Sequence, residues 1–330
     1  MTKLFLSLFF IAAIFSFGYT AARAQSLPGA YNTQEYLPLL KNKRVGVFAN
    51  QTSVIGNVHV VDSLRNLGVN ITKIFGPEHG FRGVADAGEK VDTYIDTQTG
   101  IPVVSLYGKK SKPSADDLQD VDVLLFDLQD VGTRFYTYIN SLQGFIESAI
   151  DNNKQLIILD RPNPNGFYID GPVLEKGYES GVGKQPVPIV YGMTIGEYGL
   201  MLIGEKWLSV AADYRPEKVN VKVIKCSNYT HRSRYVLPVK PSPNLPDMQA
   251  VYRYPSTCFF EGTVLSEGRG TAYPFQIFGH PSLPDSLFRF VPESTPGATN
   301  PKLKGQTCYG WNLHEIAPSE NKIELQWLLQ

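Results

Sequence analysis

The feature that most constrains the fold is a series of short apolar segments in the first half of the chain, each separated from the next by a stretch that suits a helix. Runs that are apolar at nearly every position suit strands buried on both faces, as in a parallel sheet with helices on each side and right-handed crossovers. The expected strands are residues 45–49, 71–75, 103–106, 123–126 and 156–159, and the expected helices are residues 59–67, 114–118 and 136–152. The sequence therefore predicts the α/β class, with a Rossmann-like parallel sheet.

The character of the chain changes after Asp160, where prolines interrupt a loop-rich stretch. Thr194 and Glu197 form a capping-box pattern that predicts a helix to about Trp207, and a strand is expected over residues 219–225. The later part is rich in proline, glycine and aromatic residues with short β-like pieces, which favours a second, smaller α+β auxiliary domain.

We place the Rossmann-like catalytic domain at residues 25–180 and the auxiliary domain at residues 181–330. Residues 322–330 suggest a helix that is interrupted while Trp327 is still exposed, so we expect the auxiliary domain to be truncated at its C-terminus.

The first residues have the pattern of an export signal. Lys3 precedes an apolar run over residues 4–17, and Ala22-Arg23-Ala24 offers a small-x-small cleavage site. We expect residues 1–24 to be a signal peptide and the mature protein to be exported, periplasmic or secreted, with no membrane association after cleavage. The 31 basic and 31 acidic residues balance, which gives no indication of a nucleic-acid partner.

Cofactor fingerprints are missing from the sequence. Asn50-Gln51-Thr52 stands after the first expected strand, where a dinucleotide-binding protein would carry GxGxxG, and no GxxxxGK[ST] or HExxH motif occurs. Three widely spaced cysteines form no CxxC pair. We therefore expect neither a nucleotide cofactor nor a protein-held metal.

Polar residues gather where the expected strands end, and in open α/β sheets this edge is where ligands bind. The candidates after the five strands are Asn50, Gln51, Glu78, His79, Arg82, Asp127, Asp130, Arg134, Tyr136, Asp160, Arg161 and Asn163, and later loops add Asn244, Glu267 and Arg269. Any one strand-end acid more often caps a helix or stabilises a turn. The repetition along one edge is what indicates a binding or catalytic site.

Five of these segments carry a resemblance to a known family. GPEHGFRG at 76–83, the run 127–138, DRPNPNG at 160–166, YGMTIGE at 191–197 and PSPNLP at 241–246 are similar, in this order, to the exo-β-N-acetylmuramidases of bacterial cell-wall recycling. The resemblance extends from about residue 45 to the end. It implies a Rossmann-like domain, a smaller auxiliary domain, a cleft between them, and release of N-acetylmuramic acid from non-reducing ends. It also implies that Glu78 is the catalytic acid.

Cleavage of a glycosidic bond usually needs a second carboxylate as base or nucleophile. Asp127 and Asp130 are the candidates, with Glu267 as a further one. The lactyl carboxylate of the sugar needs a cation, for which a planar guanidinium is suited. We expect Arg82 or Arg134 to supply it, with Arg161 and Arg269 as alternatives, and Tyr136 or Tyr138 to stack on a sugar face.

Two other classes of function remain open on the residues alone. One is a secreted carbohydrate- or peptidoglycan-binding protein without turnover. The other is a metal-dependent amidase or deacetylase that uses Asp127 and His79 around the metal. Release of a free reducing sugar separates the glycosidase from the first, and zinc dependence separates it from the second.

Overall fold

A computed structural model describes residues 25–83, 92–108 and 110–329. The expected signal peptide lies outside the described residues. A seven-stranded sheet forms the centre of the molecule, with the order β5-β6-β4-β1-β7-β8-β9. Its strands are β1 (Arg44–Ala49), β4 (Asn70–Gly76), β5 (Tyr94–Ile95), β6 (Pro102–Ser105), β7 (Val123–Asp127), β8 (Gln155–Leu159) and β9 (Val221–Ile224). All neighbours pair in parallel except β5 and β6, so the predicted Rossmann-like parallel sheet is confirmed.

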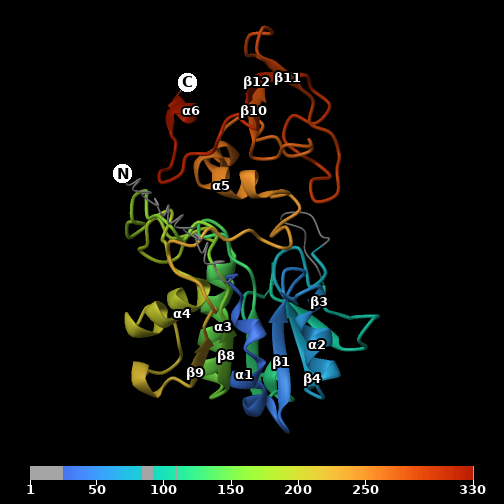
Figure 1. Ribbon diagram of the computed structural model, residues 1–330, viewed down its shortest axis with the longest axis vertical. Helices are drawn as coiled ribbons and strands as arrows, with labels where there is room; N and C mark the ends of the chain where they lie inside the picture. The colour runs from blue at the N-terminus through green and yellow to red at the C-terminus, as the bar shows by residue number, and fades with distance from the viewer. Residues whose placement is uncertain (1–24, 84–91, 109, 330) are drawn as a thin grey trace, which may run out of the picture.

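Helices cover both faces of this sheet (Figure 1). One face packs on α1 (Thr33–Leu40) and α2 (Val60–Asn66), and the other on α3 (Tyr138–Asp151) and α4 (Ile195–Gly204). Short 3-10 turns stand at η1 (Gly29–Tyr31), η2 (Asp116–Leu118) and η3 (Pro216–Lys218), and a two-stranded hairpin joins β2 (Val54–Ile55) to β3 (Val58–His59). The helix expected at 114–118 is thus only a 3-10 turn, while those expected at 59–67 and 136–152 are present.

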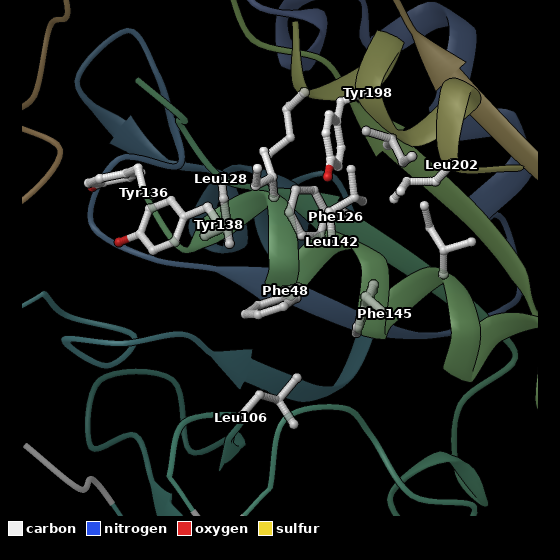
Figure 2. Close-up of a cluster of buried hydrophobic side chains, with 14 of the residues drawn as sticks. Phe48, Leu106, Phe126, Leu128, Tyr136, Tyr138, Leu142, Phe145, Tyr198 and Leu202 are labelled. Atoms are coloured by element: carbon white, nitrogen blue, oxygen red, sulfur yellow. The ribbon is translucent and has the colours of Figure 1, made fainter. Parts of the chain in front are cut away.

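Side chains of each strand alternate between the two faces, as the pleat requires. In β1, Val45, Val47 and Ala49 belong to the core on the α1 and α2 side, while Phe48 belongs to the core on the α3 and α4 side. Figure 2 shows the second of these cores, where Phe48, Phe126 and Phe145 pack together. This alternation decides which way each residue after a strand points.

The capping box predicted for the fourth helix is present. Glu197 N donates to Thr194 Oγ1 over 3.2 Å, and Thr194 N donates to Glu197 Oε2 over 2.9 Å. Asp160 adds a further cap, because its carboxylate accepts from Gly196 N and from Thr194 Oγ1, both over 2.8 Å.

The smaller C-terminal part contains α5 (Met248–Thr257), the 3-10 turn η4 (Cys258–Gly262), and a three-stranded antiparallel sheet in the order β10-β12-β11. Its strands are β10 (Ile277–His280), β11 (Phe288–Phe290) and β12 (Cys308–Asn312), and a short α6 (Gln326–Leu329) follows. Figure 1 shows this part beyond the carboxyl ends of the β-strands of the large sheet. The α+β auxiliary domain is confirmed, although the helix expected at 322–330 begins only at Gln326.

The domain boundary expected near residue 180 is wrong in position. Helix α4 packs on α3, and β9 pairs with β8, so the α/β unit extends to at least Ile224. The proline-rich stretch after β8 is a long connection that returns to the same sheet, which is why a change in composition did not mark a change of domain. Among the described residues, no helix has the length and apolarity needed to span a bilayer.

Candidate active site

A cavity of about 390 Å³ lies between the carboxyl edge of the large sheet and the C-terminal part. This volume is within the range of sites that bind small molecules. The residues that line it come from the loops after β4, β6 and β7, from the β8 to α4 connection, and from the C-terminal part. They are Glu78, His79, Tyr107, Phe135, Tyr136, Thr137, Tyr138, Gly181, Val182, Ser242, Leu245, Tyr254, Glu261, Arg269 and Phe275.

Glu78 stands in a tight turn directly after β4. Gly80 N donates to Pro77 O over 2.9 Å, and both His79 (φ 67°) and Gly80 (φ 73°) have left-handed backbone conformations. A left-handed histidine is uncommon, and backbone strain of this kind concentrates at functional sites. The turn places the half-buried Glu78 side chain at the cavity.

Two hydroxyl groups contact the Glu78 carboxylate. Thr137 Oγ1 donates to Glu78 Oε2 over 3.2 Å. Tyr107 also forms a hydrogen bond with Glu78, and burial together with the nearby carboxylate raises the pKa of Tyr107 to about 12. Tyr107 therefore stays a neutral hydrogen-bond donor at any physiological pH.

The second carboxylate that faces the cavity is Glu261, in η4. Its Oε1 forms an ion pair with Nη2 of Arg269, and its Oε2 accepts from the Cys258 thiol over 3.3 Å. Burial lowers the pKa of Arg269, but the Glu261 carboxylate outweighs this effect and the pKa is raised. Glu261 is thus ion-paired with Arg269 in the wall of the cavity that Glu78 also lines.

Arg269 is itself fixed by its surroundings. Its Nε lies 3.3 Å from Glu267 Oε1, and its guanidinium lies over the Phe275 ring at 5.0 Å. Glu267 is buried and also pairs with Lys302 over 2.9 Å. Within the described residues, Glu267 is not part of the cavity wall, so its role is to hold Arg269.

Asp127, expected as a second catalytic carboxylate, points away from the cavity. It is completely buried and forms a bidentate ion pair with Arg161, with Oδ2 2.8 Å from Nη2. Leu125 and Asp127 share the face of β7 that packs on α1 and α2, whereas the cavity adjoins the opposite face. Asp127 and Arg161 are therefore structural, and Asp127 does not join His79 in a metal site. Among the described residues, no group of three or more His, Cys, Asp or Glu side chains is arranged to hold a metal.

Asp130, the other expected carboxylate, is also turned into the protein. Its Oδ2 accepts from Tyr191 Oη and, over 2.6 Å, from Gly132 N. Burial raises the pKa of Asp130 to about 6. Asp130 does not appear in the wall of the cavity as far as the chain is described. Neither of the two acids expected as the second carboxylate therefore lines it, whereas Glu261 does.

Arg82 and Arg134, the two arginines expected to bind the lactyl group, contact other parts of the protein instead of the cavity. Arg82 pairs with Asp96, 2.7 Å from Nη2 to Oδ2, and Arg134 donates to the carbonyl oxygens of Pro172 and Val187. In the part of the chain that the structure describes, Arg269 lines the cavity and these two do not. Their guanidinium groups secure loops around the site.

Most of the expected polar binding residues also fasten loops. Asp160 caps α4, Asn163 Nδ2 donates to Met193 O over 2.8 Å, and Asn244 Nδ2 donates to Gly297 O over 2.9 Å. Gln51 Nε2 donates to Pro241 O over 3.1 Å.

Of the residues selected from the sequence, Glu78, His79, Tyr136 and Arg269 lie at the cavity, together with Tyr138. Tyr107, Glu261 and Tyr254 were not selected as site residues. Tyr107 stands in a polar cluster after an expected strand and Glu261 stands beside a glycine, which are signals that could have found them, whereas Tyr254 has no such local signal.

An α/β scaffold with a cavity of this size and two glutamates in its wall is compatible with a glycoside hydrolase, which uses a pair of carboxyl groups. The two domains of the family described as exo-beta-N-acetylmuramidase NamZ match this chain, the N-terminal one at residues 45–249 and the C-terminal one at residues 252–328. The chain therefore belongs to the NamZ family of exo-β-N-acetylmuramidases.

Individual relatives agree with this membership. The peptidoglycan β-N-acetylmuramidase NamZ of Bacillus subtilis (strain 168) is 42% identical over 299 residues, which are 85% of this chain and 70% of that protein. Two crystal structures of DUF1343 family proteins from Bacteroides fragilis NCTC 9343 are also similar. BF0379 has a TM-score of 0.83 at 45% identity, covering 93% of this chain and 82% of that one. BF0371 has a TM-score of 0.77 at 33% identity, covering 92% and 80%.

Proposed function

We propose that this protein is an exo-acting glycoside hydrolase that releases N-acetylmuramic acid from the non-reducing ends of peptidoglycan fragments. Family membership supports the reaction, and one structural observation carries the chemistry: Glu78 and Glu261 line the same cavity from opposite domains. A glycosidase needs one carboxylic acid and one carboxylate on either side of the scissile bond.

The partners of the two glutamates support a division of roles, because those of Glu78 are the neutral hydroxyl groups of Thr137 and Tyr107 while Glu261 is paired with a cation. In this proposal Glu78, the glutamate of the motif that carries the family resemblance, protonates the glycosidic oxygen. Glu261, ion-paired with Arg269, is the charged partner that acts on the anomeric carbon or on the attacking water. The anomer first formed, read by proton NMR during turnover, distinguishes these two routes for Glu261.

Arg269 is the guanidinium that recognises the lactyl carboxylate in this proposal, because it lines the cavity. Its Nη2 pairs with Glu261 and its Nε with Glu267, so the proposal has Nη1 donate to the ligand. The charges of Glu261, Glu267, Arg269 and Lys302 sum to zero, so an incoming carboxylate does not meet a net negative cluster on this side of the cavity.

The decisive assay uses a disaccharide with N-acetylmuramic acid at its non-reducing end. The wild-type protein is expected to release free N-acetylmuramic acid, and Glu78→Gln to slow this release by about 10²–10⁴-fold. A binding protein would retain the disaccharide without cleaving it. A metal-dependent amidase or deacetylase would release no free N-acetylmuramic acid and would lose its activity with a chelator, regained with zinc.

We also propose that the protein acts outside the cytoplasm, on the basis of the signal pattern in residues 1–24. Cell fractionation tests this placement. Recovery of a chain that begins at Gln25 from the periplasm or the medium is the expected result, and retention of an uncleaved cytoplasmic chain would contradict it.

A further inference from the structure

A hydrogen-bond chain leads from the loop after β7 to the wall of the cavity, and the direction of each donor in it is fixed as far as the Tyr138 oxygen. It begins at the backbone N–H of Gln129, which donates to Thr52 Oγ1 over 3.1 Å. A backbone N–H only donates, so Thr52 Oγ1 is the acceptor here and its single proton is used elsewhere. That proton is donated to Asn50 Oδ1 over 2.6 Å.

The amide of Asn50 is therefore oriented without ambiguity. Its Oδ1 also accepts from Thr52 N over 3.0 Å, so two donors identify this atom as the oxygen. The other end of the amide is then the nitrogen, and Nδ2 donates to Tyr138 Oη over 2.7 Å. Asn50, the residue directly after β1, is completely buried, and its amide contacts the first residue of α3.

This arrangement determines what Tyr138 offers to a ligand. Its oxygen is an acceptor toward Asn50, so its own proton is directed away from Asn50. Tyr138 lines the cavity beside Thr137, which donates to Glu78. Figure 2 shows the Tyr136 and Tyr138 rings at one end of the apolar cluster, with both hydroxyl oxygens directed away from Leu142 and Phe145. The neighbouring Tyr136 hydroxyl donates to Pro241 O over 2.9 Å, so it supplies no donor of its own to the cavity. The Tyr136 and Tyr138 hydroxyl groups are also hydrogen-bonded to each other, so the Tyr136 oxygen is the acceptor from which a bound ligand takes the Tyr138 proton.

We propose that Tyr138 is a hydrogen-bond donor to the saccharide bound beside Glu78, and that Asn50 is the positioning residue that directs its proton. The inference rests on the proposed function, because it names a contact within that site. It changes the role expected for Asn50 from contact with substrate to orientation of a tyrosine, and the role of Tyr138 from ring stacking to hydrogen bonding. Burial raises the pKa of Tyr138, so the hydroxyl keeps its proton at any working pH.

The test compares kcat and KM for the muramic-acid disaccharide, and Kd for free N-acetylmuramic acid, between the wild type and three variants. Tyr138→Phe removes the donor and is expected to lower kcat/KM about 10- to 100-fold, since a polar group of the ligand loses its partner in a closed site. Asn50→Asp has nearly the same size, but its free carboxylate oxygen accepts the Tyr138 proton and turns it away from the cavity. We expect a loss of similar size. Asn50→Ala leaves the hydroxyl free to rotate and is expected to lose less.

The matched control is Tyr198→Phe, the same chemical change in the core. The Tyr198 hydroxyl is buried and has no hydrogen-bond partner among the described residues, so its removal is expected to leave kcat, KM and Kd within twofold of the wild type. Melting temperatures of all variants show whether a loss of activity comes from unfolding.

Coupling between the two residues distinguishes positioning from a merely structural role. When Asn50→Asp is added to Tyr138→Phe, we expect no further loss in kcat/KM or Kd, because the proton that Asn50 directs is already gone. An additive loss in a folded double variant, or a Tyr138→Phe variant within twofold of the wild type, overturns the proposal.

Wild-type turnover tests the function separately. If the wild type binds N-acetylmuramic acid without cleaving the disaccharide, the function fails while the ratios of Kd still decide the inference, and a wild type that neither binds nor cleaves overturns both.

Discussion

The loop after β4 and the loop after β7 end at the same edge of one sheet, yet they direct their acids in opposite ways. Glu78 lies two residues beyond its strand, in a turn with two left-handed residues, and it reaches the cavity. Asp127 is the last residue of its own strand, on the face that packs against α1 and α2, and it is buried against Arg161. The comparison teaches that position at a strand end does not make an acid catalytic. The parity of the residue within the strand, and the turn that follows, decide its direction.

Substitution of Glu78 gives the largest effect on the cavity side of this comparison. Glu78→Gln keeps the size of the side chain but has no proton to give, and general acid catalysis contributes typically 10²–10⁴-fold, so kcat is expected to fall by about that factor. The loss is smaller on an aryl glycoside, whose phenolate leaving group needs little protonation, and product binding measured by calorimetry stays close to that of the wild type. Near-normal turnover of Glu78→Gln would reverse the assignment of the acid.

Substitution of Asp127 tests the core side. Asp127→Asn leaves the buried Arg161 without a charged partner, and breaking a buried ion pair in this way costs about 3–5 kcal/mol of folding stability. Urea denaturation measures the loss. Glu261→Gln is the matched control, because its side chain is 38% exposed and its ion pair contributes at most about 1 kcal/mol. A stable Asp127→Asn variant that has lost only turnover would move Asp127 back into the site.

The pH dependence of the folding stability tests whether Asp130 is protonated in the folded protein. Its folded pKa of about 6 lies above the unfolded value of about 3.9, so the native state holds more protons between these values. The contribution of Asp130 to stability is therefore fully present below about pH 4 and is lost as the pH rises through 6. Asp130→Asn imitates the protonated form, so the stability of the wild type should fall by about 2 kcal/mol relative to this variant between pH 4 and 7. A constant difference across this range would show that Asp130 is charged throughout.

The smallest expected effect concerns the wall of the cavity opposite Glu78. Arg269→Lys keeps the charge but not the planar fork, and we expect KM for muramic-acid substrates to rise about tenfold, or about 1.4 kcal/mol. A glucosamine analogue without the lactyl group should show little change in KM. Equal changes on both substrates would mean that Arg269 serves only to hold Glu261.

Much of the fold could be predicted from the sequence because local signals determine it. The apolar runs at 45–49 and 123–126 are strands, and Thr194 with Glu197 caps a helix. The boundary near 180 failed because β9 returns to the sheet after a connection whose composition resembles a linker.

The site was only partly predictable. Glu78 could be selected from its motif, and its place at the cavity agrees with that selection, although the catalytic role stays a prediction. Glu261 could not be selected, because its relation to Glu78 depends on how η4 folds back over the sheet edge. Asp127 was misread because a strand that is apolar on both faces does not reveal which face its last residue occupies.

The late arrival of β9 sets a condition on how this chain can fold. Strand β8 pairs with β9, which lies more than sixty residues further along the chain. The start of the described chain also pairs with the segment after β9, through a bridge between Leu27 and Ser227. Gly29 N also donates to Asp160 O over 2.7 Å. These contacts are distant in sequence, and their loops must close before any contact energy is gained. Until the residues around 227 have joined the sheet, the folding chain therefore keeps an open edge at β8, where another chain can add.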